Sequence, residues 1–264
     1  EPVTVSDKEN AKEMPTIRGE VTFDHVAFSY DETKKILKDV SFTVKPGESV
    51  ALVGPTGAGK STIVNLISRF YNVDSGRVLI DGQDISEVTI HSLRSQMGIM
   101  MQDSFIFSGT IGDNIRYGKL TASEDEIRKA SRIVCANDFI SRMPEGYDTE
   151  VRERGSMLSQ GQKQLISFAR TLLSDPSILI LDEATSSIDV QTEKALQPGL
   201  NAMLQGRTSF IIAHRLSTIR GCDRIMYIDD GGIMETGSHE ELMAKKGYYY
   251  KLYTAQLEEV HKTA

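Results

Sequence analysis

The apolar and polar positions of the chain fall into segments that predict strands alternating with helices. Residues 21–30 (VTFDHVAFSY) alternate between apolar and polar side chains, which is the period of a half-buried strand. Residues 49–54 (SVALVG) are almost continuously apolar, as in a central strand buried on both faces. Helical spacing follows at 61–70 (STIVNLISRF). Further strand-like segments lie at 39–44, 77–82, 97–101, 177–184, 208–214, 223–229 and 231–237. This order predicts a mostly parallel α/β sheet, with an antiparallel β part formed by the early alternating strands.

The pattern changes between about residues 103 and 155, where helix-like segments replace strands. Ser123 followed by Glu126 is typical of a capping box, in which two side chains satisfy backbone N–H groups at a helix start. Residues 124–134 and 136–143 then have helical character. This stretch predicts a mainly helical insertion between the strands.

A second capping pattern lies near the C-terminus. Ser238 and Glu241 have the same spacing and predict the start of a final helical stretch. Gly247 predicts one break in that stretch before it continues toward the end of the chain.

One helical pattern contains a proline. Residues 190–204 have helical spacing, but Pro198 and Gly199 lie inside the segment. An interior proline costs about 3 kcal/mol because it removes a hydrogen bond and clashes with the preceding turn. The sequence therefore predicts a helix that stops or kinks near Gln197.

Composition narrows the class of protein. The chain has 264 residues, of which 39% are hydrophobic and 25% charged, as in an ordinary globular domain. Its net charge of −7 argues against a nucleic-acid binder. Its two cysteines, Cys135 and Cys222, form no disulfide framework and fit a reducing compartment. No apolar run approaches the ~18 residues of a membrane span, and residues 1–19 have the composition of a polar linker.

Residues 54–61 (GPTGAGKS) predict a phosphate site. They match G-x-x-x-x-G-K-[ST] and lie between a predicted buried strand and a predicted helix. Glycines let the backbone curl so that successive N–H groups point at phosphate oxygens, and the helix dipole adds positive potential. In such a loop Lys60 reaches the β- and γ-phosphates and Ser61 ligates Mg²⁺. We call residues 54–61 the phosphate loop.

A pair of acids follows a second buried strand. Residues 178–183 (ILILDE) place Asp182 at the carboxyl edge of the sheet, where it could hold the metal through water. Glu183, one residue further, could take a proton from an attacking water. Together with the phosphate loop, these acids predict nucleotide hydrolysis.

Three other residues end predicted strands and have two interpretations each. Tyr30 could simply pack, or its ring could stack on a base. Gln102 could be an ordinary strand-end amide or a ligand, and His214 could be structural or could donate to a γ-phosphate oxygen. Read alone, each of the three favours its structural interpretation.

Taken together, the motifs resemble those of a known family. FSY, GPTGAGKST, MMQD, LSQGQ, ILILDEAT, SSID and IIAHR, in this order and spacing, resemble the nucleotide-binding domain of ATP-binding cassette (ABC) transporters. The resemblance covers about residues 20–253. It implies a RecA-like P-loop NTPase core with an antiparallel β subdomain and a helical subdomain, which binds ATP and Mg²⁺. Residues 1–19 would link to the last transmembrane helix, 20–103 and 169–264 would form the core, and 104–168 the helical, signature-bearing subdomain.

The resemblance also implies a role for each matching residue. Tyr30 would stack on adenine, Gln102 would sense metal and water, His214 would contact the γ-phosphate, and Asp189 would communicate with an opposing site. The expected catalytic residues are Glu183, His214, Lys60 and Gln102. The expected metal ligands are Ser61, Gln102 and, through water, Asp182. The expected nucleotide-contacting residues are Tyr30, Gly54, Thr56, Gly57, Ala58, Gly59, Lys60, Ser61, Thr62, Gln102, Ser159, Gly161, Gln162, Asp182 and Asp189.

Two further stretches resemble exporter-type cassettes. These are residues 103–115 (DSFIFSGTIGDNI) and 149–155 (TEVRERG). In exporter-type cassettes the second stretch, usually TEVGERG, lies near the intracellular helices of the transmembrane domains. Arg152 stands where the usual TEVGERG has glycine. The resemblance implies exporter transmembrane domains as partners, at the cytoplasmic face of the cell membrane, with no nucleic acid and with bilayer contact only through those domains. An exposed charged loop without a partner is the alternative for 149–155.

The signature stretch LSQGQ departs from the family pattern LSGGQ. In the family two cassettes close head-to-tail, so that Ser159 and the backbone near Gly161 would hold a γ-phosphate bound to the partner, at a helix start. Gln160 replaces the first glycine. If this position needs a positive φ, glutamine is costly, and if its φ is ordinary, glutamine is tolerated. The departure fits a heterodimer with one weakened site, in which Glu183 serves the competent site, and fits equally a homodimer that tolerates Gln160.

The predicted function is therefore that of an ATP-binding and ATP-hydrolysing motor domain of an ABC exporter, which dimerises on ATP. A soluble cassette ATPase of DNA repair or translation is one alternative, but it predicts basic surface runs or long coiled-coil insertions, which the sequence lacks. A nucleotide-gated regulatory module with little hydrolysis is another. Asp182, Glu183 and His214 count against that module, and Glu183→Gln separates it from an enzyme.

Overall fold

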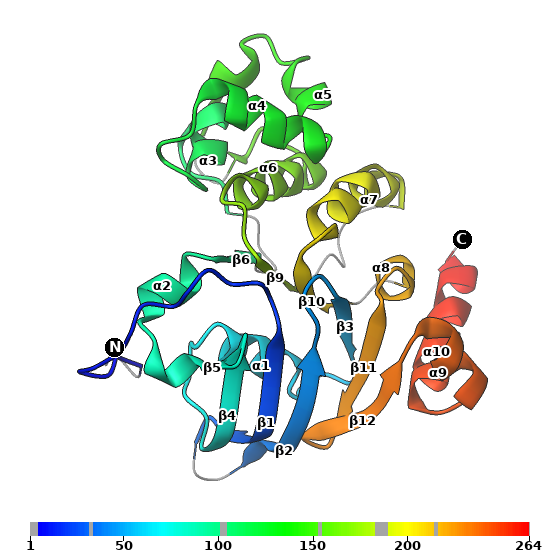
Figure 1. The fold of residues 1–264 in the computed structure, drawn as a ribbon. Helices are drawn as coiled ribbons and strands as arrows, with labels where there is room; N and C mark the ends of the chain where they lie inside the picture. Colours follow the sequence, from blue (N-terminus) through cyan, green and yellow to red (C-terminus); the bar gives the residue numbers. More distant parts are fainter. Residues whose placement is uncertain are drawn as a thin grey trace.

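The computed structural model describes residues 5–31, 34–100, 105–152, 155–182, 190–213 and 216–263. Within these ranges the strands form a six-stranded, a four-stranded and a two-stranded sheet. Figure 1 shows the two larger sheets together at one end of the molecule and a group of helices, α3 to α6, at the other. This arrangement confirms an α/β core that carries an antiparallel β part and a helical part.

The six-stranded sheet is the centre of the core. Its strands in spatial order are β12 (Gly232–Gly237), β11 (Arg224–Asp229), β3 (Ser49–Val53), β10 (Thr208–Ile212), β9 (Ile178–Asp182) and β6 (Met97–Met100). β11, β3, β10, β9 and β6 are mutually parallel, and β12 pairs antiparallel with β11. Every residue of β3 and β10 is buried, and all of them except Ser49, Thr208 and Ser209 are apolar, as expected of central strands.

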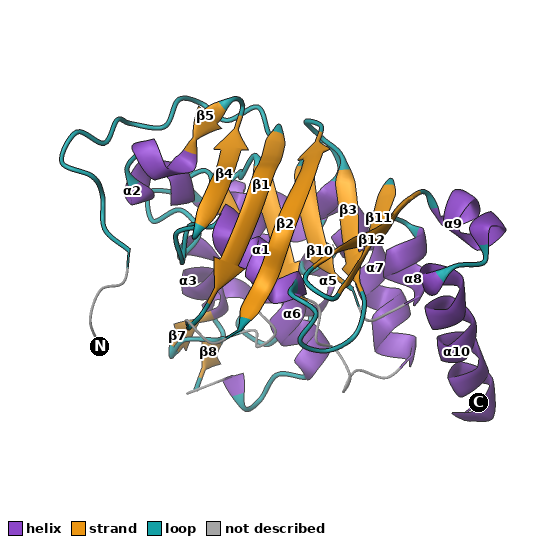
Figure 2. Cartoon of the chain, turned by 90° about the horizontal axis from the view of Figure 1, so that it is seen from below, coloured by secondary structure: helices purple, strands orange, loops and turns teal. Residues whose placement is uncertain are grey.

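The early strands form the antiparallel sheet that their alternating pattern predicted. In spatial order it contains β2 (Lys35–Val44), β1 (Val21–Ser29), β4 (Ser75–Ile80) and β5 (Gln83–Asp84). Figure 2 shows β2, β1, β4 and β5 side by side at the front of the molecule, with α1 behind them. The two-stranded sheet pairs β7 (Gly109–Thr110) with β8 (Glu150–Val151).

Helices connect and cover the strands. Their bounds are α1 (Lys60–Ile67), α2 (Ile90–Arg94), α3 (Ile111–Arg116), α4 (Glu124–Ile133), α5 (Asn137–Ile140), α6 (Gln160–Leu173), α7 (Val190–Leu204), α8 (Leu216–Arg220), α9 (His239–Lys245) and α10 (Tyr248–Thr263), with short 3-10 turns η1 (Ile85–Glu87) and η2 (Gly146–Asp148). None of the helices in the described ranges combines the length and the apolar character needed to cross a bilayer.

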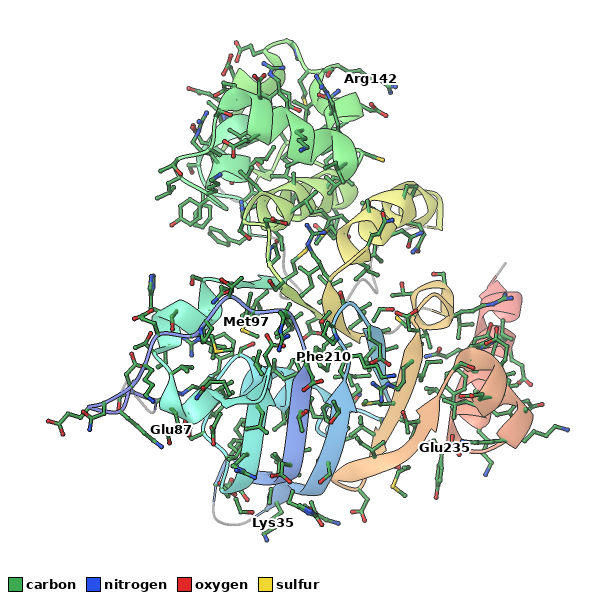
Figure 3. All side chains as sticks on the ribbon, viewed as in Figure 1. Lys35, Glu87, Met97, Arg142, Phe210 and Glu235 are labelled. Carbon is green, nitrogen blue, oxygen red and sulfur yellow. The ribbon has the colours of Figure 1, made fainter. Side chains whose placement is uncertain are left out.

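The central strands divide the hydrophobic core into two layers. Successive side chains of a strand point to opposite faces. In β3, Val50 and Leu52 therefore join the cluster that contains α1 and the antiparallel sheet, while Ala51 and Val53 join the cluster beneath the helices. Figure 3 shows Phe210 of β10 among packed side chains in the middle of the molecule, and Arg142 at the far end of the helical part. Both layers are built on one sheet, so they fix the position of its strand ends.

The helical insertion and its cap are confirmed. Ser123 precedes α4, and its hydroxyl accepts the N–H of Glu126 while the Glu126 carboxylate accepts the N–H of Ser123. α6 runs without interruption across residue 168, so the helical part and the core share this helix.

The predicted break near Gly247 is also confirmed, because α9 ends at Lys245 and α10 begins at Tyr248. The cap at Ser238 and Glu241 has the same reciprocal hydrogen bonds as the cap of α4.

The sequence predicted a helix that stops or kinks near Gln197, and the stop is wrong. α7 continues through Pro198 to Leu204. A Cβ on Gly199 would lie 2.6 Å from the carbonyl oxygen of Val134 at the end of α4, so the backbone of α7 lies directly against that helix end. Pro198 itself is exposed, and packing on both sides of it holds the helix together.

Candidate functional site

The phosphate loop connects β3 to α1 and is shaped by its glycines. Gly54 has φ of 136°, and a Cβ there would lie only 2.0 Å from the carbonyl oxygen of Ile228, so no other residue fits. Gly57 has φ of 80°, and a Cβ there would meet no heavy atom within 4 Å. Gly59, at 107°, precedes the first residue of α1. The loop is therefore closely packed at its start and open in its middle, as a phosphate cradle requires.

Lys60 lies inside the curve of this loop. Its side chain is 8% exposed, and its Nζ donates hydrogen bonds to the carbonyl oxygens of Gly54 at 2.8 Å and Pro55 at 2.7 Å. Burial lowers the pKa of Lys60 because it removes water from the ammonium group, and the nearby carboxylate of Asp182 acts in the opposite direction. The loop thus holds a buried cation beside its open middle.

The next residues of α1 divide between surface and interior. Ser61 is exposed, whereas Thr62 is buried and its hydroxyl lies 3.1 Å from the hydroxyl of Tyr30. Thr56 is exposed and Ala58 is buried. The structure therefore brings all predicted phosphate-loop residues and Tyr30 into one region.

Tyr30 follows β1 and is held by several groups although its side chain is 48% exposed. Asn65 of α1 donates to its hydroxyl at 3.4 Å. Its ring makes nearly perpendicular contacts with Phe28 and Tyr71, with centroids 4.9 and 5.0 Å away. Asn65 and Tyr71 were missed by sequence reasoning. Asn65 follows Thr62 by one helical turn, which is a usable signal, whereas nothing in the sequence links Tyr71 to Tyr30.

The parallel register brings the strand ends to one edge. Ile212 of β10 pairs with Leu52 of β3 and with Asp182 of β9, and Met100 of β6 pairs with Leu181. The phosphate loop, Asp182 and the chain leaving β6 and β10 therefore start from the same edge of the sheet. Gln102, Glu183, Asp189 and His214 lie outside the described residues, and their roles stay predictions.

A surface cavity of about 190 Å³ adjoins the phosphate loop. Residues 55–58 form one wall, and Lys35, Lys38 and Asp230 are among the residues opposite. The Lys38 ammonium pairs with the Asp230 carboxylate at 2.6 Å, which lowers the pKa of Asp230. The open middle of the loop is thus accessible from solvent.

No preformed metal cage is present in the described ranges, where no group of three or more His, Cys, Asp or Glu side chains converges. Asp182 is half-buried at the end of β9, and Ser61 is the second residue of α1, which starts from the same sheet edge. One carboxylate and one hydroxyl are the partial set that Mg²⁺ takes when phosphate oxygens and waters complete its shell. The residues present therefore fit Mg²⁺ bound together with a nucleotide.

The signature residues form the start of α6. Ser159 is the N-cap: its hydroxyl accepts the N–H of Gln162 at 3.2 Å, and the Gln162 side chain accepts the N–H of Ser159 at 2.9 Å. Gln160 is the first helical residue, is exposed, and has no left-handed backbone. Gly161 is buried. The backbone therefore does not require glycine at position 160.

The two exporter-like stretches meet in space. β7 pairs with β8, and the N–H of Ile111 donates to the carbonyl oxygen of Thr149. Beside this pairing Phe105, Phe107 and Tyr117 form a ring cluster with centroids 4.9 and 4.6 Å apart, and they are 53%, 37% and 60% exposed. We call these three residues the aromatic surface.

Known proteins resemble this chain closely. The ABC transporter family model matches residues 37–186. A Bacillus subtilis protein described as the uncharacterized ABC transporter ATP-binding protein YknV is 56% identical over 252 residues, which are 96% of this chain and 42% of that protein. The probable multidrug resistance ABC transporter ATP-binding/permease protein YheH of the same organism is 51% identical over 246 residues, which are 93% of this chain and 37% of that protein.

A solved structure agrees with these relatives. The structure of a bacterial Atm1-family ABC exporter with ATP bound superposes with a TM-score of 0.88 at 48% identity, over 96% of this chain and 44% of that one. The chain thus spans less than half the length of each of these relatives.

Proposed function

The chain belongs to the ABC transporter family, and from this premise we propose that it is the ATP-hydrolysing nucleotide-binding domain of an exporter. The observation that carries the proposal is the common sheet edge, from which the phosphate loop, Asp182 and the strand ends of β6 and β10 all start. Relatives named as ATP-binding/permease proteins are more than twice as long as the matched part, so a permease would account for the remainder.

The phosphate loop would bind the triphosphate. Its N–H groups and the start of α1 supply positive potential, and Lys60 would exchange the carbonyl oxygens of Gly54 and Pro55 for β- and γ-phosphate oxygens. A phosphate beside Lys60 would favour its charged form and so oppose the effect of burial on its pKa. Tyr30 would stack on the base through its exposed ring.

The metal would be held by Ser61, by Gln102 and, through water, by Asp182. When bound, Mg²⁺ would neutralise charge on the phosphate oxygens and orient them for in-line attack. Glu183 would accept the proton of the attacking water, and His214 would contact the γ-phosphate. Gln102 would sense both the metal and that water.

Dimerisation would complete the site. Ser159 and the buried backbone at Gly161, at the start of α6, would contact the γ-phosphate bound to a second cassette, with Asp189 at the same interface. Gln160 lies in ordinary helical backbone, so it adds no strain to this contact. One reason to expect a heterodimer was that glutamine at position 160 could strain the backbone and weaken the signature stretch. Without that strain, a homodimer becomes the simpler arrangement.

The aromatic surface would dock on the transmembrane domains at the cytoplasmic face of the membrane. Three neighbouring aromatic side chains that are a third or more exposed are favoured at protein interfaces. Arg152, exposed at the end of the pairing of β7 and β8, would lie beside this contact.

Turnover and dimer mass of Glu183→Gln test the proposal. We expect the unchanged chain to hydrolyse ATP with Mg²⁺, and Glu183→Gln to retain ATP binding while losing hydrolysis. A nucleotide-gated regulatory module predicts negligible turnover for both proteins. Light scattering during gel filtration then measures mass: a dimer of the variant with ATP supports a homodimer, whereas a monomer that binds ATP supports a different partner chain.

A further inference from the structure

The ring of Tyr30 is held by Phe28 of its own motif and by Tyr71, which belongs to none of the motifs. Phe28 and Tyr71 contact it nearly at right angles, with interplanar angles of 88° and 86°. Tyr71 also contacts Phe28, at 5.6 Å between centroids. An exposed ring at a strand end would otherwise rotate among side-chain rotamers, so these contacts fix the orientation in which Tyr30 meets a base.

The turn that carries Tyr71 is fixed by two arginines. Arg94 donates from Nε to the carbonyl oxygen of Ser68 at 2.9 Å and from Nη2 to that of Arg69 at 2.7 Å. Its guanidinium also stacks on the ring of Phe70, 4.6 Å from the centroid. These bonds satisfy two carbonyl oxygens of the turn that follows α1. The residues leading to Tyr71 are therefore tied to α2.

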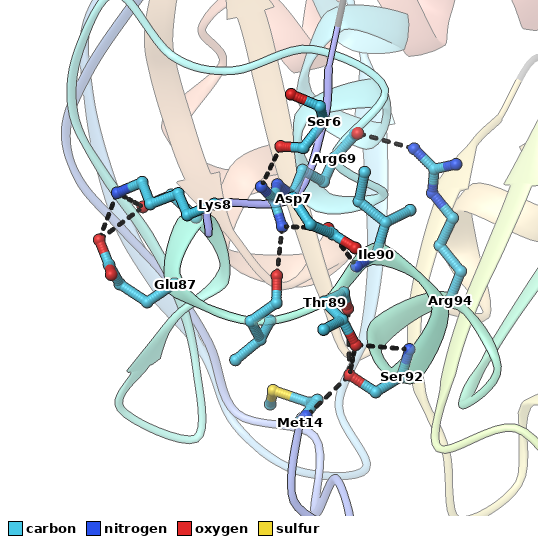
Figure 4. A network of polar contacts seen from close by, with 12 residues as sticks. Ser6, Asp7, Lys8, Met14, Arg69, Glu87, Thr89, Ile90, Ser92 and Arg94 are labelled. Carbon is cyan, nitrogen blue, oxygen red and sulfur yellow. Dashed lines mark hydrogen bonds and ion pairs between the residues drawn. The ribbon is translucent and has the colours of Figure 1, made fainter. Parts of the chain in front are cut away.

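The second arginine ties the same turn to the start of the chain. Arg69 is 2% exposed and donates to the carbonyl oxygens of Val88 and, at 3.1 Å, Ser6 (Figure 4). The Asp7 carboxylate lies 3.6 Å from its guanidinium and accepts the N–H of Ile90 at 2.8 Å. Loss of these partners would leave an unpaired charge in the interior, which strongly destabilises a folded protein.

The rest of this N-terminal segment, residues 5–20, lies along the core. Met14 and Ile17 are buried, and their N–H groups donate to Ser92 and Gln96, each at 2.8 Å. At its end the backbone N–H of Glu20 donates to the carboxylate of Asp81 at 2.9 Å. The segment therefore follows a defined path along the core, and its first residues contact Arg69.

From this arrangement we propose that Tyr71 is a positioning residue for the nucleobase and that the N-terminal segment sets its position through Arg69. A cavity of about 260 Å³, lined by Ser6, Lys8, Arg69 and Tyr71 among others, lies between the segment and the tyrosine, so the connection runs through the Arg69 turn. Displacement of Ser6 and Asp7 would remove two of the three groups that hold the Arg69 guanidinium, leaving Val88. Because Arg94 would still hold the backbone of the turn, the expected effect is a loosening of Tyr71, two residues further, and of the ring of Tyr30, and not their release. The inference rests on the proposed function in one respect, the stacking of Tyr30 on the base.

Calorimetry with two ligands tests this proposal. The dissociation constant of ATP depends on contacts with both the base and the phosphates. That of inorganic tripolyphosphate depends on contacts with the phosphate loop alone, and both are measured with Mg²⁺. We expect Tyr71→Leu to weaken ATP binding roughly three- to tenfold, the worth of an aromatic pair, and to leave tripolyphosphate binding within about twofold. Tyr71→Phe, which keeps the ring, is the matched control and should bind both ligands like the unchanged chain.

A double-mutant cycle separates this inference from the proposed function. Tyr30→Ala alone should weaken ATP binding, and adding Tyr71→Leu to it should cause no further loss. Asp7→Asn should weaken ATP binding in the unchanged background and have no effect beside Tyr71→Leu. If Tyr30→Ala binds ATP normally, the stacking role is wrong. Three results would show that Tyr71 has no positioning role although Tyr30→Ala binds ATP weakly. In the first, Tyr71→Leu binds ATP as tightly as the unchanged chain; in the second, its loss of ATP affinity adds to that of Tyr30→Ala. In the third, Tyr71→Leu loses as much affinity for tripolyphosphate as for ATP.

Discussion

Alanine substitutions at three glycines test whether residues 54–61 contact a nucleotide. Gly57 in the phosphate loop and Gly47 in the turn between β2 and β3 have φ of 80° and 78°, and neither would place a Cβ within 4 Å of another heavy atom. Gly54 differs, because its Cβ would lie 2.0 Å from the carbonyl oxygen of Ile228, a backbone atom that cannot rotate away. Gly47→Ala thus reports the conformational cost of alanine alone. Gly54→Ala adds a steric clash to that cost, and Gly57→Ala adds the effect on a bound ligand.

The expected stability changes follow from this geometry. Alanine in left-handed backbone costs about 1–2 kcal/mol, and this cost applies equally to Gly47→Ala and Gly57→Ala. For a chain of this size each kcal/mol lowers the melting temperature by about 2–4 °C. Gly54→Ala adds a backbone clash of about 1–3 kcal/mol, so it should be the least stable of the three.

Thermal unfolding without nucleotide and calorimetric titration with Mg-ATP measure the two effects separately. Gly47→Ala and Gly57→Ala should lose the same stability, but Gly57→Ala should bind ATP at least about tenfold more weakly, because its methyl group fills space that phosphate oxygens need. Equal ATP affinity of these two variants would refute the assignment of residues 54–61 as the phosphate loop.

Further variants test local features of the fold. Ser159→Ala should lower the free energy of unfolding by about 1 kcal/mol and increase amide exchange in the first turn of α6, whereas Ser159→Thr should not, since it keeps the acceptor of the cap. Pro198→Ala should raise the free energy of unfolding by up to about 3 kcal/mol, because it removes an interior proline from α7. Gly199→Ala should lower it by about 1–3 kcal/mol, because its Cβ would lie 2.6 Å from the carbonyl oxygen of Val134. Chemical denaturation that gave the opposite signs would contradict the packing of α7 on α4. The Lys119 ammonium, with the hydrogen bonds from Ser123, lowers the pKa of Glu126 to about 2, so its contribution to stability is complete above the usual glutamate pKa and is lost as pH falls toward 2. The protection factors of the α4 amides, which correct for the pH dependence of intrinsic exchange, should therefore fall between pH 5 and pH 2 (about the two pKa values), and Glu126→Gln should flatten that fall.

The sequence by itself determined the local elements and the nucleotide motif. Alternating residues in β1, the buried runs of β3 and β10, and the capping pairs at Ser123 and Ser238 were all recognisable, because each depends on residues close together in the chain. The phosphate loop was recognisable for the same reason, since its glycines, its lysine and its serine are contiguous.

Only the tertiary structure decided features that depend on distant neighbours. The local cost of Pro198 predicted a helix that stops or kinks, but α7 does not stop there, and it lies against α4 through a contact that no local pattern records. The same holds for Gln160, whose place in the first turn of α6 is ordinary helical backbone, and for Tyr71 and Arg69, which connect the N-terminal segment to Tyr30. Local signals are worth about 1–3 kcal/mol each, and packing between segments far apart in the chain contributes energies of the same size. A pattern in the sequence therefore fixes an element only where the contacts made by the folded chain do not oppose it.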